Sequence, residues 1–196
     1  MVVDVDEVLA MFMRGFERFL GAQGLEMRLT TYALFQSIFR PGEAEHLDLA
    51  SGRRLFDRFF ETHVEAIEAA PGAADGLARL ARSASIVILT NAPEHSREAR
   101  ARWLAESGFP YPLIVGAGPK GPAVAALAAR TTRPAAFVDD LLSNLESVAQ
   151  AAPAVHRFQM VADERLRALA FADLARHRRI DDWPDLSEAI AQAVGI

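Results

Sequence analysis

The chain has 196 residues, of which 51% are hydrophobic and 24% are charged, as in one ordinary globular domain or a core domain with a smaller insert. Its net charge of −5 argues against nucleic acid or an anionic membrane as the main partner, and without cysteine it can form neither a disulfide nor a thiolate metal site. No signal peptide opens the chain and no apolar run is long enough to span a bilayer, so the expected compartment is the cytoplasm.

The N-terminal third predicts one short strand followed by helices. The stretch Val-Val-Asp-Val-Asp-Glu-Val-Leu at the start of the chain predicts a short buried strand with two carboxylates at its tip, and apolar residues then recur at helical spacing over residues 8–20, 30–39 and 52–68. Eight of the twelve phenylalanines lie between residues 11 and 61, which indicates a module with its own apolar centre. We therefore expect a small all-helical insert over residues 10–70, ended by Pro71-Gly72.

After this boundary, helices and strands alternate. We expect strands at residues 85–89, 112–116, 134–138 and 154–160, and helices at residues 73–82, 94–107, 123–129, 142–151, 163–177 and 186–194. Such alternation predicts an α/β, Rossmann-like parallel sheet flanked by helices, built from residues 1–9 and 71–196. Ligands of these sheets bind beyond the carboxyl ends of the strands.

Two carboxylates follow the first strand. Asp4 and Asp6 are two residues apart, so their side chains share one face of an extended chain. Two like charges at this spacing are stable together only if a cation lies beside them or if one carboxyl keeps its proton. The alternative is an Asp-x-Asp turn in a solvated loop.

Three later strand ends and loops carry similar candidates. Thr90-Asn91 and Asp139-Asp140 each end an apolar run, and each pair could instead cap the helix that follows it. Lys120 lies in a Gly-Pro-Lys-Gly-Pro loop and is the only lysine among 21 basic residues. A lysine kept in an arginine-rich chain favours a site that needs a compact point charge, rather than a chance surface residue.

These pieces, in this order, resemble the haloacid dehalogenase-like (HAD) superfamily of phosphohydrolases. The resemblance depends on four segments: Val3-Asp4-Val5-Asp6-Glu7-Val8, Ile88-Leu89-Thr90-Asn91, Gly118-Pro119-Lys120 and Phe137-Val138-Asp139-Asp140-Leu141-Leu142-Ser143-Asn144. Each segment is short, but together they spread over about 140 residues of the chain. The insert at residues 10–70 stands where that superfamily places its cap domain.

The resemblance implies a role for each catalytic candidate. Asp4 would be the nucleophile that accepts the phosphoryl group, and Asp6 would be the general acid and then the general base. Thr90 and the backbone amide of Asn91 would hold phosphate oxygens. Lys120 would neutralise the charge shared by Asp4 and the phosphoryl group.

The resemblance also implies a Mg²⁺ ion. Its ligands would be the Asp4 carboxylate, the Asp6 backbone carbonyl, Asp140 and waters, an oxygen-rich shell of the kind that Mg²⁺ prefers. Asp139 is ambiguous: it would act through water or through hydrogen bonds around the ligands, and Asn144 would support the loop.

The expected function is therefore a Mg²⁺-dependent phosphohydrolase that acts on a small phosphorylated metabolite through an aspartyl-phosphate. Asp6 disfavours dehalogenation, because a halide leaves without a proton. An insert without lysine disfavours phosphonate cleavage through an imine. A non-catalytic or phosphate-binding HAD-like protein, or a phosphotransferase with the same core, is the alternative. Nucleotides and sugar phosphates both remain open as substrates, as does the oligomeric state.

Several residues keep two interpretations. Glu7, where many relatives have glycine, would hydrogen-bond within its loop or influence substrate charge, and His95 and Asp181-Asp182 are more typical of surface positions. Four arginines of the insert could supply a substrate-binding charge: Arg14, Arg28, Arg40 and Arg53. Since only three residues precede Asp4, either the natural chain begins earlier or the first strand is short.

Overall fold

The computed structural model describes residues 1–196 and contains a six-stranded parallel sheet. The strands are β1 (Val2–Val3), β4 (Val87–Thr90), β5 (Leu113–Val115), β6 (Ala136–Asp139), β7 (His156–Gln159) and β8 (Arg178–Arg179). Their order is β5-β4-β1-β6-β7-β8. Val3 of the central strand pairs with Ile88 on one side and Val138 on the other. Residues that follow β1 therefore lie between those that follow β4 and β6.

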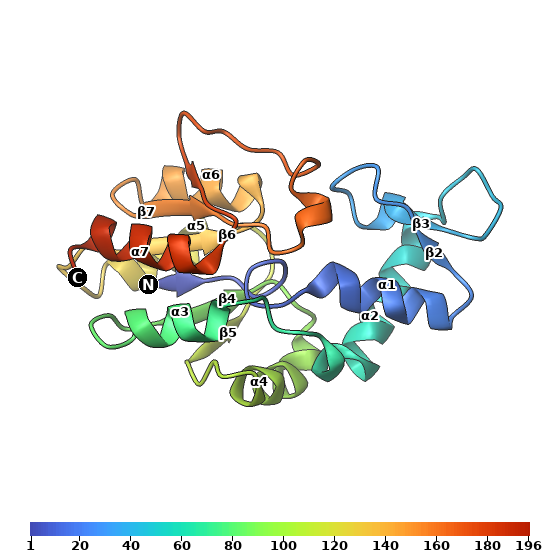
Figure 1. The fold of residues 1–196 in the computed structure, drawn as a ribbon, viewed down its shortest axis with the longest axis horizontal. Helices are drawn as coiled ribbons and strands as arrows, with labels where there is room; N and C mark the ends of the chain where they lie inside the picture. The colour runs from blue at the N-terminus through green and yellow to red at the C-terminus, as the bar shows by residue number, and fades with distance from the viewer.

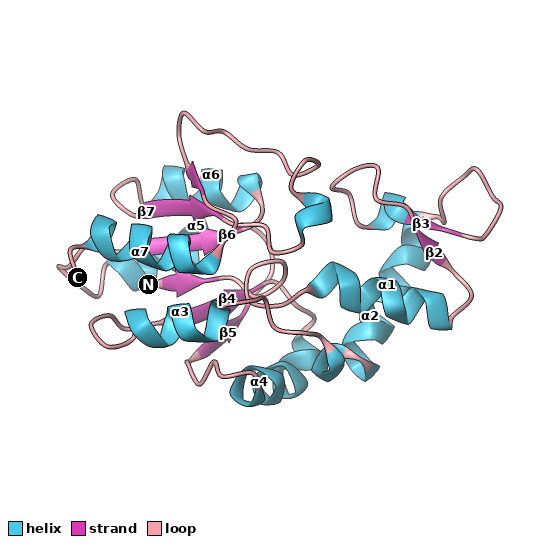
Figure 2. Ribbon diagram, in the orientation of Figure 1, coloured by secondary structure: helices cyan, strands magenta, loops and turns pink.

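Helices cover both faces of this sheet (Figures 1 and 2). They are α3 (Ala73–Leu80), α4 (Arg97–Glu106), α5 (Gly121–Ala128), α6 (Leu142–Ala151) and α7 (Trp183–Val194). Side chains alternate across the strands, so that Val3 packs in one core with Leu77 of α3 and Leu186 of α7. Val2 packs in a second core with Val124 of α5 and Leu145 of α6. The α/β, Rossmann-like fold predicted from the sequence is confirmed.

The segment between β1 and α3 lies at one end of the molecule, beyond the carboxyl ends of the strands (Figure 1). It contains α1 (Phe12–Ala22), β2 (Glu26–Met27), a 3₁₀ turn (Phe35–Ser37), β3 (Ile38–Phe39), α2 (Leu49–Thr62) and a second 3₁₀ turn (Val64–Ala66). Phe12, Phe16 and Phe59 pack ring to ring between α1 and α2. The exact division of the chain at residues 9/10 and 70/71 stays a prediction.

The helix predicted over residues 30–39 is wrong, and the insert is therefore not wholly helical. β2 and β3 form an antiparallel pair there, with Met27 opposite Ile38. Ile38 and Phe39 are buried in this pair, and the loop before them carries Tyr32 toward the sheet. The apolar spacing was compatible with a helix, but long-range contacts decide the structure of so short a run.

The helix predicted over residues 163–177 is also wrong. Only a 3₁₀ turn forms, at Glu164–Leu166, and an irregular segment leads to β8. Side chains satisfy backbone carbonyls that a helix would otherwise pair: Arg179 donates to the carbonyl of Arg167, and Gln159 donates to that of Phe171.

The helix predicted over residues 142–151 has the predicted bounds, and the remaining elements are present with shifted ends. The largest shift is in the third helix of the insert, which was expected over residues 52–68 and occupies Leu49–Thr62, where Asp48 caps it by accepting from the Ser51 amide. None of the helices has the length and apolar character that crossing a membrane requires.

Candidate active site

Three neighbouring strands bring the predicted residues together at one edge of the sheet. Asp4 follows β1, Thr90 ends β4, and Asp139 ends β6. Since β1 is flanked by β4 and β6, Asp4 lies between the other two, and its amide donates to the Val138 carbonyl (3.0 Å).

Lys120 joins two of these carboxylates. Its Nζ lies 2.6 Å from Oδ1 of Asp4 and 2.7 Å from Oδ2 of Asp139, and the side chain is 1% exposed. Burial lowers the pKa of the ammonium, but the charges of Asp139 and Asp4 outweigh burial and raise it. Lys120 is therefore a fixed positive charge between two strand ends.

The position of Lys120 depends on how closely α5 approaches α6. Gly121 follows Lys120 at the start of α5, and its amide donates to Oγ of Ser147 on α6 (3.0 Å). A Cβ on Gly121 would overlap the backbone carbonyl of Ser147. Only glycine permits this approach, which holds the lysine at the sheet edge.

Both carboxylate oxygens of Asp139 accept hydrogen bonds. One oxygen accepts from the Leu141 amide (2.9 Å) and from Nδ2 of Asn144 (3.0 Å), and the other oxygen accepts from Lys120. Both oxygens therefore have hydrogen-bond partners, and Asn144 ties Asp139 to the start of α6. The part that Asp139 plays at a metal stays a prediction.

Asp140, the next residue, is bonded differently. Its Oδ2 accepts a 2.7 Å hydrogen bond from the Tyr32 hydroxyl, which comes from the insert. Burial, together with the nearby charges of Asp139 and Asp4, raises the pKa of Asp140 well above its usual range. This carboxylate would be stabilised by a cation.

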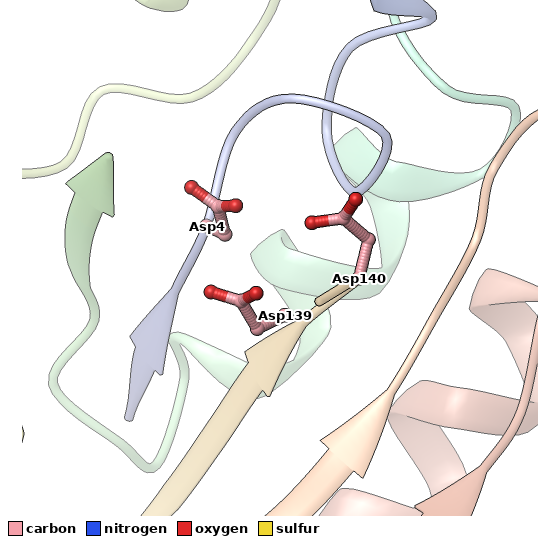
Figure 3. A group of neighbouring side chains, drawn as sticks. All are labelled: Asp4, Asp139 and Asp140. Atoms are coloured by element: carbon pink, nitrogen blue, oxygen red, sulfur yellow. The ribbon is translucent and has the colours of Figure 1, made fainter. Parts of the chain in front are cut away.

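Asp4, Asp139 and Asp140 form the one cluster of side chains that could bind a metal ion, with one oxygen from each within 4.8 Å of the others. Figure 3 shows their carboxylates around a common space at the ends of β1 and β6. Burial raises the pKa of Asp4 to about 7 although Lys120 opposes the shift. Three buried carboxylates facing a single ammonium make an oxygen-rich donor set with excess negative charge, which suits Mg²⁺.

Asp6 has a partner that the sequence did not predict. Nη2 of Arg100, on α4, donates to Oδ1 of Asp6 (2.7 Å). The Arg100 side chain is fully buried, with its guanidinium 5.0 Å from the ring centre of Phe60 and 5.6 Å from that of Trp103. Arg100 is one of many arginines in a helix of ordinary pattern, so no signal in the sequence could have selected it.

Glu7 is a buried anchor of the loop after β1. Its carboxylate accepts from the amides of Met13 (2.7 Å) and Asp163 (3.1 Å), and its carbonyl accepts from the amide of Ala162 (2.8 Å). It is the only non-glycine residue with positive φ, at 57°. Of the two interpretations of Glu7, the hydrogen bonds favour the one within the loop, extended here to the segment after β7.

Thr90 has an unused hydroxyl. Its Oγ1 is buried without a hydrogen-bond partner, although the residue lines the cavity described next. Buried hydroxyls are normally paired, so this atom is available to a ligand. The neighbouring Asn91 side chain donates to the carbonyl of Gly118 (2.8 Å) and ties β4 to the loop before Lys120.

A cavity of about 180 Å³ lies above the cluster. Its lining joins the strand ends to the insert and consists of Asp4, Asp6, Glu7, Phe12, Met13, Tyr32, Leu34, Phe56, Thr90, Asn91, Lys120, Asp140, Leu141 and Asn144. All predicted site residues except Asp139 line the cavity. Asp139 lies outside the lining and contacts Lys120. His95 is exposed and lies outside the lining, while Asp182 caps α7 and Asp181 pairs with Arg179.

No protein-family model matches the sequence, and no curated protein matches it. Solved structures do match over nearly the whole chain. YfnB from Bacillus subtilis, bound to magnesium, superposes with a TM-score of 0.65 at 14% identity, over 96% of each chain. A haloacid dehalogenase-like family hydrolase from Streptococcus pneumoniae, SP0104, gives 0.63 at 14% identity, also over 96% of each chain.

A third match carries both expected ligands. The D,D-heptose 1,7-bisphosphate phosphatase from B. bronchiseptica, complexed with magnesium and phosphate, gives a TM-score of 0.52 at 16% identity, over 98% of this chain and 97% of its own. At these identities the matches establish the fold. The chain has the fold of the HAD-like hydrolases, as its sequence motifs predicted.

Proposed function

We propose that this protein is a Mg²⁺-dependent phosphohydrolase that cleaves a small phosphate monoester through an aspartyl-phosphate on Asp4. One observation carries the proposal: Lys120 is buried against Asp4 and Asp139, in the lining of a cavity that also contains Thr90 with its unpaired hydroxyl. An ammonium and an unpaired hydroxyl that line the same cavity as a carboxylate are suited to a phosphoryl group that this carboxylate attacks.

The ion would be held by the carboxylates of Asp4 and Asp140 and by the backbone carbonyl of Asp6. Asp139, whose oxygens are both occupied, would keep Lys120 and the loop before α6 in place. When bound, Mg²⁺ supplies positive charge to the phosphoryl oxygens and to the attacking carboxylate. The magnesium-bound structures of the same fold support this assignment.

The residues of the chain would carry out two displacements. First, an oxygen of Asp4 forms a bond to phosphorus while the bond to the ester oxygen breaks, and Asp6 gives its proton to the leaving alkoxide. Water then attacks the phosphorus of the aspartyl-phosphate and gives a proton to Asp6. The carboxylate of Asp4 and inorganic phosphate are released, and Asp6 is again protonated.

The fixed charges near phosphorus lower the barrier for both displacements. Lys120 neutralises the charge shared by Asp4 and the phosphoryl oxygens, while Thr90 and the Asn91 amide hydrogen-bond to those oxygens. The segment that contains α1, α2 and the β2–β3 hairpin would act as a cap that excludes water from the site. An acceptor alcohol in place of water would make the same residues a phosphotransferase.

The test is hydrolysis of p-nitrophenyl phosphate with and without Mg²⁺. We expect activity that requires the ion and is lost in Asp4→Asn, because an amide oxygen is a far weaker nucleophile. Asp75→Asn, at an exposed position of α3, is the matched control and should keep full activity. Robust, Mg²⁺-dependent activity in Asp4→Asn would exclude the aspartyl-phosphate route, and an inactive wild type would exclude the function.

A further inference from the structure

The half of the cavity that faces the insert has a lining unlike that of the half at the sheet. We propose, on the basis of the proposed phosphohydrolase function, that the leaving group of the substrate is a compact, uncharged, apolar alcohol of aromatic or branched alkyl type. The substrate would thus be a phosphate monoester whose only charged group is the phosphate.

The insert contributes apolar side chains and one tyrosine hydroxyl to the cavity. Five of its residues line the space, from the start of α1, the loop before β3, and α2: Phe12, Met13, Tyr32, Leu34 and Phe56. Leu141 of the core continues this surface. The Tyr32 hydroxyl is the one polar group among them, and it already donates to Asp140. No side-chain donor on this side remains for a sugar hydroxyl.

No cation is available for a second anionic group. Lys120 is the only basic residue in the lining, and Asp4 and Asp139 already neutralise it. None of the insert's seven arginines lines the cavity. Of the four predicted candidates, Arg14 pairs with Asp163 and Glu164, Arg28 with Glu26, and Arg40 with Glu43, while Arg53 is exposed.

The carboxyl groups of the lining make an anionic leaving group still less favourable. Asp6 and Glu7 also line the cavity, so a carboxylate or second phosphate would be buried beside carboxyl groups, without a cation to pair with. The volume of about 180 Å³ lies below the range of about 300–1,000 Å³ that is typical of drug-sized ligands. A phosphate monoester of benzyl or isobutyl size is consistent with both limits.

The inference can be tested with four esters of primary alcohols, so that leaving-group chemistry is similar throughout. Benzyl phosphate and isobutyl phosphate represent the apolar class, and 2-phosphoglycolate and glycerol 3-phosphate represent the charged and hydroxylated classes. With Mg²⁺ present, we expect kcat/KM for benzyl phosphate to exceed that for 2-phosphoglycolate at least about tenfold.

A charge-introducing variant tests whether the insert determines this preference. Leu34→Arg places a cation at a half-buried position of the lining and should shift the ratio toward 2-phosphoglycolate by about tenfold. Leu49→Arg, at a position of α2 that is 41% exposed and outside the lining, is the matched control and should leave the ratio unchanged.

The outcomes separate this inference from the proposed function. A wild-type enzyme that prefers 2-phosphoglycolate or glycerol 3-phosphate, or that cleaves p-nitrophenyl phosphate and none of the four esters, overturns the apolar leaving group and leaves the phosphohydrolase intact. If p-nitrophenyl phosphate is also untouched, the proposed function is lost and the inference with it. Because the wild-type ratio decides alone, a misfolded Leu34→Arg protein would not rescue a failed prediction.

Discussion

The hydroxyl of Tyr32 donates a 2.7 Å hydrogen bond to Oδ2 of Asp140, and this bond links the insert directly to the carboxylate cluster at the sheet edge. The two residues are 108 positions apart in the sequence. The site is therefore assembled from two parts of the chain, and the insert helps to orient the Asp140 carboxylate.

Removing this hydrogen bond should weaken catalysis. In Tyr32→Phe, Oδ2 of Asp140 loses its partner while the ring still fills the cavity. We expect kcat/KM for p-nitrophenyl phosphate to fall about tenfold, since an unpaired buried acceptor costs about 1–3 kcal/mol. Tyr111→Phe is the matched control, because Tyr111 is the other tyrosine and lies outside the cavity. Equal kcat/KM in the two variants would show that the Tyr32–Asp140 hydrogen bond does not contribute to catalysis.

Replacing Arg100 should reduce activity most on esters with poor leaving groups. Arg100→Met keeps the length and packing of the side chain beside Phe60 and Trp103 but releases the Asp6 carboxylate. We expect a loss of about 10²-fold for an alkyl phosphate and a much smaller loss for p-nitrophenyl phosphate, whose leaving group needs little protonation. Arg100→Lys should recover part of the alkyl phosphate activity.

The control for this series lies on the same helix. Arg102 of α4 is exposed and pairs with Glu65, so Arg102→Met should affect neither ester. An equal loss on both esters in Arg100→Met would show that Arg100 supports the fold of the site rather than the position of Asp6.

Replacing Gly121 should reduce both stability and activity, although the residue has no side chain. Gly121→Ala forces α5 away from Ser147 and displaces Lys120, and we expect it to lower the free energy of unfolding by about 1–3 kcal/mol and to reduce activity. Gly21→Ala, in α1 with open space around it, should instead stabilise the protein by up to about 1 kcal/mol. Urea unfolding of both variants measures the difference, and a stable, active Gly121→Ala would contradict the close packing.

The buried carboxyl of Glu7 should make stability depend on pH. Burial raises its pKa to about 7 in the folded protein, whereas the ordinary value is 4.5. A folded-state pKa above the unfolded one stabilises the protein below pH 4.5, and this contribution is lost as the pH rises through 7. The loss amounts to about 3 kcal/mol for a shift of this size.

Glu7→Gln isolates this contribution, because glutamine cannot ionise. Without metal, the free energy of unfolding of the variant relative to wild type should rise between pH 5 and pH 8, measured by urea unfolding at each pH. A difference that stays constant with pH would contradict the raised pKa of Glu7.

The sheet and its strand-end residues could be predicted because they depend on short-range patterns. The run before Thr90 and the run before Asp139 are continuously apolar, as buried parallel strands are, and strand order then places their ends beside Asp4. The lone lysine could be selected by composition alone. The structure brings all of these residues to one cavity and its floor.

Tyr32 and Arg100 could not be predicted, because long-range contacts give them their places. Tyr32 lies in a run whose spacing favours a helix, and only the pairing of β2 with β3 turns it toward Asp140. Arg100 reaches Asp6 across 94 positions of sequence. The false helix over residues 163–177 has the same origin, since its carbonyls are satisfied by side chains such as Arg179 from beyond the segment.

A crystal structure of the protein with Mg²⁺ and BeF₃⁻, which imitates a phosphoryl group on a carboxylate, tests whether Asp4 is the nucleophile. We predict beryllium bonded to an oxygen of Asp4, fluorines within hydrogen-bond distance of Lys120 Nζ and Thr90 Oγ1, and the ion bound by Asp4 and Asp140. Beryllium fluoride bound elsewhere, or an ion that does not contact Asp140, would contradict the account.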